Sequence, residues 1–144
     1  CPVHLWGPRK QHIEQWRKNR SLIPLIPPAH PDWIVTIAFY TALHVVDAVL
    51  RTDKNERITS HSSRHDVLMC VKRYDAIWEK HQPLYNLSRT VRYTANPALW
   101  VPYACIEKQV LGRYLYPIEK SAFGLMGIEY PFERIVLSGS FANH

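Results

Sequence analysis

The chain has 144 residues, enough for one domain with one sizeable hydrophobic core. Hydrophobic residues make up 47% of the sequence and aromatic residues 12%, a composition that excludes a disordered chain. Lysine and arginine number 18 against 12 acidic residues, so the net charge of +6 permits nucleic acid as a partner without requiring it.

The first predicted elements are a basic helix and a proline-rich connection. Residues 9–20, RKQHIEQWRKNR, place Ile13 and Trp16 three residues apart among polar side chains, which predicts a short surface helix. The following SLIPLIPPAHPDW holds four prolines between Pro24 and Pro31, so it cannot form a regular helix. Its apolar residues therefore stay displayed, and we expect them to form an interface between two copies of the chain.

Residues 33–50 form the longest apolar stretch, and Asp32 is expected to cap the helix that it predicts. A helix that is apolar nearly all round, with one polar stripe, is typical of the centre of a soluble bundle. Successive residues advance by about 100° in a helix. The polar stripe therefore consists of Tyr40, His44, Asp47 and Arg51.

A membrane span is the alternative interpretation of this stretch. Its length is borderline for crossing a bilayer. A charged group at mid-bilayer costs a few kcal/mol, and Asp47 lies only a turn from the end of the stretch. The N-terminal CPVHLWGPRK also lacks the features of a signal peptide. We therefore expect no membrane. The three cysteines, Cys1, Cys70 and Cys105, have no CxxC spacing, and Cys70 and Cys105 lie in predicted apolar helices, where reduced thiols pack. Reduced cysteines indicate a cytoplasmic location. A cysteine at the first position also suggests that the chain is part of something longer.

Two further helices are expected after the polar segment RTDKNERITSHSS. Apolar spacing of three and four runs from Val67 to Trp78, preceded by Ser63 and Asp66 as an approximate capping box. The pattern restarts at Pro83 and continues to residues 93–94.

A last helix is predicted to begin with Asn96 as its cap and Pro97 at its first position, with Pro102 still inside the tolerated first turns. Its apolar face comprises Leu99, Ala104, Cys105, Val110, Leu111, Tyr114 and Leu115. No run alternates long enough to build a sheet. The prediction is an all-α, four- or five-helix up-and-down bundle over residues 1–123, followed by an irregular tail over 124–144.

Three polar groups are candidates for function. The plain interpretation of the Tyr40–His44–Asp47–Arg51 stripe is a set of buried side chains that satisfy one another. Because a carboxylate on so apolar a helix needs a partner, we also expect this stripe to reach residues 60–65 or 88–93, with Arg64 and Arg92 as the best candidates. The segment SHSSRHD (60–66) places an arginine at a helix start, where anions bind, although a solvated cap is the alternative. His61 and His65 could be read as a metal pair, but a third and fourth ligand are missing, so we expect no metal. The third group is LSRTVRYT (87–94), a basic helix whose default role is solvated surface.

The order of FYTALHVVDAVL, SHSSRHDVL and YNLSRTVRYT resembles small prokaryotic proteins of the HEPN superfamily, in which a YYAALH…DA helix, an SHxxR loop and an SxxARY helix follow one another. With HIEQWRKN as the first helix, the resemblance covers roughly residues 11–95. It implies a helical bundle that pairs into a homodimer, and a metal-independent ribonuclease of a defence or toxin–antitoxin system with a cognate antitoxin. The usual pair in that family is an arginine followed, after four to six residues, by a histidine. This sequence departs from it: three residues separate Arg57 from His61, and seven separate Arg73 from His81.

Two function classes follow, and neither requires a cofactor. In a ribonuclease, His61 would take the proton from a ribose 2′-hydroxyl and Arg64 would offset charge on the phosphorus oxygens. In a non-catalytic nucleotide-binding, nucleic-acid-binding or protein-interaction module, the same residues would hold a phosphate or join helices. Catalysis needs His61 and Arg64 beside a cleft, whereas a structural role needs them buried and bonded to each other. The residues expected to support either role are Tyr40, His44, Asp47, Ser60, Ser88, Arg92 and Tyr93.

Overall fold

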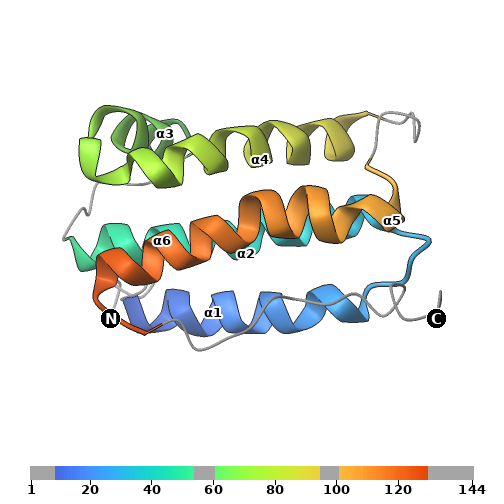
Figure 1. Ribbon diagram of the computed structural model, residues 1–144, viewed down its shortest axis with the longest axis horizontal. Coiled ribbons are helices and arrows are strands. Elements are labelled where there is room, and N and C mark those ends of the chain that lie inside the picture. The colour runs from blue at the N-terminus through green and yellow to red at the C-terminus, as the bar shows by residue number, and fades with distance from the viewer. Residues whose placement is uncertain (1–8, 54–60, 95–100, 130–144) are drawn as a thin grey trace, which may run out of the picture.

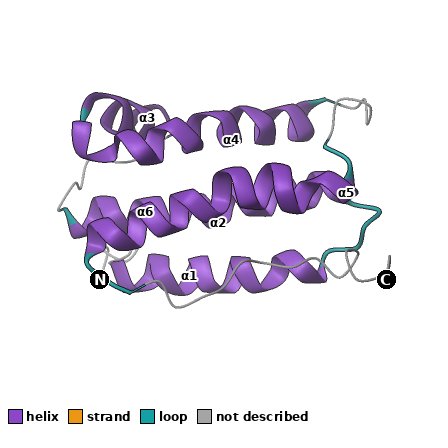
Figure 2. Cartoon of the chain, in the orientation of Figure 1, coloured by secondary structure: helices purple, strands orange, loops and turns teal. Residues whose placement is uncertain are grey.

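The computed structural model describes residues 9–53, 61–94 and 101–129, which are helical with short connections (Figure 1). Figure 2 shows no strand in this part of the chain, so the predicted all-α bundle is confirmed. The α-helices are α1 (Arg9–Leu22), α2 (Pro31–Thr52), α3 (His61–Cys70), α4 (Asp75–Tyr93), α5 (Tyr103–Ile106) and α6 (Tyr116–Met126). Two 3₁₀ turns, η2 (Ile23–Leu25) and η3 (Lys72–Tyr74), and a π-helix, η5 (Glu107–Leu115), complete the described elements.

Helix α2 lies at the centre and packs against α1, α4 and α6 (Figure 1). The prediction that residues 33–50 form the most buried helix is confirmed, although Trp33 itself is 57% exposed. Thr36 and Thr41 are buried with their hydroxyl groups satisfied, because each hydroxyl donates a hydrogen bond to the carbonyl four residues earlier. The buried residues of α2 are Ile34, Val35, Thr36, Ala38, Phe39, Thr41, Ala42, Leu43, Val45, Val46, Ala48, Val49 and Leu50.

Helix α2 begins one residue earlier than its predicted cap. Pro31 occupies the first helical position, where its missing N–H costs nothing, and His30 is the N-cap residue. Asp32 therefore lies in the first turn and does not cap the helix. Its negative charge there interacts favourably with the helix dipole. By length and composition α2 could cross a membrane, but 72% of its apolar window is buried inside the structure, as in the core helix of a bundle.

Helix α1 lies at the surface, as predicted, and most of its described side chains are exposed or partly exposed, but one residue belongs to the core. Trp16 is fully buried, and its indole N–H donates a 2.7 Å hydrogen bond to Glu119 Oε2 on α6. Arg20 pairs with the same carboxylate at 2.9 Å. Trp16 anchors this otherwise polar helix, because a tryptophan ring buries a large apolar area and the Glu119 carboxylate accepts the hydrogen bond from its N–H.

The region around α3 differs from the prediction in two ways. Helix α3 already begins at His61, so Ser63 lies within the helix and does not start it. Its inward face includes polar residues, among them the buried Arg64, which a search for apolar spacing passes over. The predicted helix through Trp78 is instead broken at Val71, whose backbone is extended.

Contacts between distant segments hold this break in place. Arg73 of η3 donates to Asp53 at the end of α2 and to the carbonyl of Leu125 in α6. Tyr74 donates its hydroxyl hydrogen to the same Asp53. Helix α4 then continues through Pro83, where a restart was predicted, with Ile77, His81, Leu84, Ser88 and Val91 as its buried residues.

The last helical segment begins later than predicted and is not a regular α-helix. Pro102 is the N-cap residue with extended backbone, and the predicted start at Asn96 lies outside the described residues. The predicted inward residues Val110, Leu111 and Leu115 are buried in the π-helix η5, whereas in α5 Ile106 is buried and Ala104 is exposed. Helix α6 ends at Met126, beyond the predicted tail boundary at 124, and Gly127 caps it with φ of 70°. Cys70, predicted to pack in a core, is exposed, and residues 130–144 lie outside the described part.

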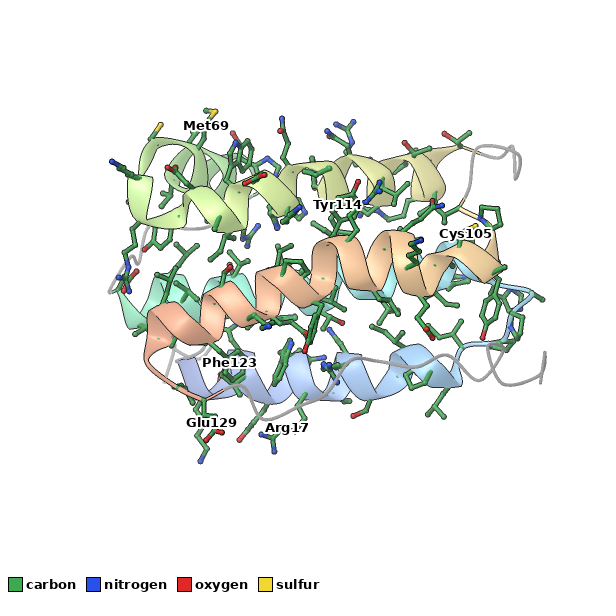
Figure 3. All side chains as sticks on the ribbon, in the orientation of Figure 1. Arg17, Met69, Cys105, Tyr114, Phe123 and Glu129 are labelled. Atoms are coloured by element: carbon green, nitrogen blue, oxygen red, sulfur yellow. The ribbon has the colours of Figure 1, made fainter. Side chains whose placement is uncertain are left out.

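Figure 3 shows how side chains from the three tiers of helices fill the spaces between them. The apolar ones among the described residues form one continuous cluster centred on α2. Polar contacts also join α2 to its neighbours: Asp47 of α2 pairs with Arg64 of α3, and Tyr40 of α2 bonds to Arg92 of α4.

Candidate functional site

Asp47 and Arg64 form an ion pair between α2 and α3. Arg64 Nε donates to Asp47 Oδ1 at 2.7 Å, and Nη2 donates to Oδ2 at 3.1 Å, so the pair is bidentate. The side chains are only 9% and 15% exposed. A buried carboxylate on an apolar helix needs a charged or donating partner, and the sequence-based expectation that Arg64 would provide it is confirmed.

Arg64 also contacts His61, one turn earlier on α3. Its Nη1 lies 3.3 Å from His61 Nδ1. A guanidinium has donors only, so His61 Nδ1 must accept this hydrogen bond. The neutral imidazole ring of His61 then carries its proton on Nε2 and can donate it to an acceptor.

Arg92 of α4 is held against α2 by a second set of contacts. Its Nη1 donates to the Tyr40 hydroxyl at 3.1 Å, and its Nε and Nη2 donate to the Ser88 carbonyl and hydroxyl at 3.2 and 3.3 Å. Its guanidinium also lies 5.3 Å from the ring centroid of Tyr93 and 5.7 Å from that of Phe39. The polar stripe of α2 therefore meets both other predicted groups, as expected.

A pocket with a volume of about 400 Å³ is lined by His61, Tyr85, Arg89, Arg92 and Tyr93. Every lining side chain donates a hydrogen bond or presents an aromatic ring, and none is a carboxylate. Among the described residues, no carboxylate forms an ion pair with Arg89 or Arg92. The pocket is thus a concave surface with uncompensated positive charge.

The charge state of His61 follows from its surroundings. Partial burial lowers the pKa of His61 below its usual 6.5, and the positive charges of Arg64 and Arg92 lower it further, against a smaller opposing effect of Asp47. The imidazole is therefore neutral at pH 7. This agrees with its role as acceptor from Arg64.

Two further histidines lie near the pocket: His65 is in contact with Tyr85, and His81 is in contact with His65. The ring of His65 is 4.5 Å from that of Tyr85 and 5.4 Å from that of His81, centroid to centroid. His81 is fully buried, and neither of its nitrogens, nor Nε2 of His65, has a hydrogen-bond partner in the part of the chain described. Burial lowers the pKa of His81 to about 3, so this ring is neutral over the physiological range.

His44 belongs to a different contact. Its Nδ1 lies 3.2 Å from Nδ1 of His12 on α1, and it does not line the pocket. Burial, and next the neighbouring His12, lower the pKa of His44. His12 is four residues before the buried Trp16 and thus shares its helix face, a signal that could have identified it.

The two residues proposed as a catalytic pair are in contact but have different surroundings. His61 lines the pocket, whereas Arg64 does not line it and is buried and bonded to Asp47. Arg92 and Tyr93 do line the pocket, while Tyr40, Asp47 and Ser88 support it from behind, and Ser60 lies outside the described residues. Sequence reasoning gave Tyr85 no role, although it lies seven residues, about two helical turns, before Arg92 on the same face of α4.

The described residues contain no group of three or more His, Cys, Asp or Glu side chains that could hold a metal ion. Comparison with protein-family models, with curated proteins and with solved structures finds no match to this chain. The chemistry of the pocket itself therefore indicates the function.

Proposed function

We propose that the chain is an RNA-binding module and that this pocket, which we call the phosphate pocket, holds a backbone phosphate of the RNA. The observation that carries this proposal is the composition of the pocket: two arginines, a histidine and two tyrosines, with no carboxylate among them. Arginine binds phosphate through its planar fork of donors, and aromatic rings stack on bases.

The arrangement of Arg92 supports binding of an anion. Tyr40 and Ser88 fix its guanidinium with hydrogen bonds, so little side-chain freedom is lost when a ligand arrives. Arg89, which is exposed, adds a second cation on the same helix. His61 can add an uncharged donor, because Arg64 keeps its proton on Nε2.

The resemblance of the ALH…DA, SHxxR and SxxxRY segments to HEPN proteins supports RNA as the source of the phosphate. Those segments supply His61, Arg92 and Tyr93 to the pocket, and Asp47 and Arg64 to the ion pair behind it. Each of the three short motifs therefore has a physical role in or behind the pocket.

A binding measurement tests the proposal. A fluorescent 2′-O-methyl RNA octamer, which cannot be cleaved at the 2′ position, should bind the wild-type protein, and Arg89→Gln should weaken binding and lower the salt dependence by about one counterion. Arg113→Gln is the matched control, because Arg113 is exposed on η5 and does not line the pocket. Equal losses in both variants would indicate a non-specific charge effect and contradict a phosphate pocket.

RNA cleavage is a second candidate function, favoured by one observation. A neutral histidine stands beside two arginines in an open pocket, which is the set needed to deprotonate a 2′-hydroxyl and stabilise the phosphorane. The 2′-oxygen would bond to phosphorus as the bond to the 5′-oxygen breaks, leaving a 2′,3′-cyclic phosphate and a 5′-hydroxyl. For Nε2 of His61 to accept the proton, the ring must first change tautomer and give up its bond from Arg64.

Incubation of labelled RNA with the protein and EDTA distinguishes the two functions. Cleavage predicts products ending in 2′,3′-cyclic phosphate and a loss of about a hundredfold or more in His61→Ala. Intact RNA that is nevertheless bound identifies a binding module. Arg64 bonds to both His61 and the buried Asp47, so Arg64→Ala should lower the free energy of unfolding as well as the cleavage rate.

A further inference from the structure

Tyr93 is an aromatic side chain exposed at the end of the phosphate pocket. It is the last residue of α4, and 75% of its surface is exposed. Burial in the core therefore does not explain its position. Its ring nevertheless lines the pocket and lies 5.3 Å from the Arg92 guanidinium.

The pocket is longer than a single phosphate group. Tyr85, beside His61, and Tyr93 are eight residues apart on α4, which corresponds to about 12 Å along the helix axis. Arg89 and Arg92 lie between these two rings in sequence. A ligand that is longer than one phosphate and contacts the arginines can therefore also reach an aromatic ring.

We propose that Tyr93 is the stacking platform for an unpaired nucleobase next to the phosphate held by Arg89 and Arg92, so that the pocket selects single-stranded over double-stranded RNA. The inference rests on the proposed function, because the phosphate places the base. Arg92 contributes to the platform, since a cation beside a tyrosine ring and a base on the ring act together in stacking sites. A base within a duplex cannot use this surface, because its neighbours cover both of its faces.

The test compares three fluorescent 2′-O-methyl probes of equal length by anisotropy: a single-stranded octamer, the same octamer with abasic positions, and its duplex. Tyr93→Ala should weaken binding of the single-stranded octamer by about 5- to 150-fold, the range for loss of one stacked base. Binding of the abasic and duplex probes should change little, because neither can stack. Tyr93→Phe should bind as the wild type does, because the ring and not the hydroxyl makes the contact.

Met69→Ala is the control, since Met69 is another exposed apolar side chain, near the end of α3 and outside the pocket. It should leave all three affinities unchanged. Because Tyr93 is exposed, circular dichroism of Tyr93→Ala should match the wild type.

The outcomes separate this inference from the proposed function. If the wild type binds the octamer with the expected dependence on Arg89, but Tyr93→Ala loses no affinity, the stacking platform is refuted and phosphate binding stands. If Tyr93→Ala weakens all three probes equally, the tyrosine acts on the pocket's shape, and base stacking is again refuted. If the wild type binds no probe, both proposals are wrong.

Discussion

Lowering the pH from 8 to 5 should destabilise the bundle through His81. The pKa of this ring is about 3 in the folded chain, against 6.5 for an unperturbed histidine such as that of the unfolded chain. The unfolded state therefore binds the proton first as the pH falls. The stabilisation is fully present above pH 6.5 and is lost as the pH decreases toward 3.

The magnitude follows from the distance of pH 5 below the unfolded pKa. At pH 5 the unfolded ring is protonated and the folded ring is not, which costs about 2 kcal/mol relative to pH 8. His61 and His65, whose pKa values are also lowered mainly by burial, add to this loss in the wild type. The variant His81→Leu removes one titrating group and two buried nitrogens without partners among the described residues.

Urea denaturation at the two pH values measures the effect. The wild type should lose free energy of unfolding between pH 8 and pH 5, and His81→Leu should lose about 2 kcal/mol less. At pH 8 the variant should be at least as stable as the wild type, because an unsatisfied buried polar group costs about 1–3 kcal/mol. Replacement of the exposed His30 by leucine is the control and should keep the wild-type dependence. An unchanged pH dependence in His81→Leu would refute the argument.

Three further results are expected. Leu43→Ala should cost about 2–4 kcal/mol in denaturant unfolding through lost burial and a cavity in the central helix, and a cost below about 1 kcal/mol would place that residue at the periphery. Arg64→Met should lower the free energy of unfolding by about 3–5 kcal/mol, because it leaves the carboxylate of Asp47 buried without its partner. Adding Asp47→Asn should recover part of this loss, and no recovery in the double-mutant cycle would contradict a coupled pair. Light scattering of the wild type should give the mass of two chains. Leu25→Asp and Trp33→Asp should shift the mass toward one chain, because both side chains are exposed apolar surface. A wild-type monomer at micromolar concentration would exclude the homodimer.

The sequence by itself determined the helical class and the central helix. Apolar spacing depends only on the rotation per residue, so residues 33–50 could be recognised as a buried helix before any neighbour was known. The same rotation placed Tyr40 and Asp47 on one stripe, and the cost of a buried carboxylate then required a partner. The contacts with Arg64 and Arg92 confirm that reasoning.

Tertiary structure decided which of these polar residues reach solvent. Arg64 and Arg92 look equivalent in the sequence, but Arg64 is neutralised by Asp47 inside the bundle, while Arg92 is held by the uncharged Tyr40 and Ser88 and lines the pocket. His81 lies four residues after Ile77 and three before Leu84, so its helix face is visible in the sequence, but the complete burial of its ring depends on the helices packed against that face. The break at Val71 is accompanied by bonds from Arg73 and Tyr74 to Asp53 at the end of α2. Local patterns report how a residue faces along its own helix, whereas charge, pKa and exposure depend on which other helix lies opposite, and that is settled only when the bundle packs.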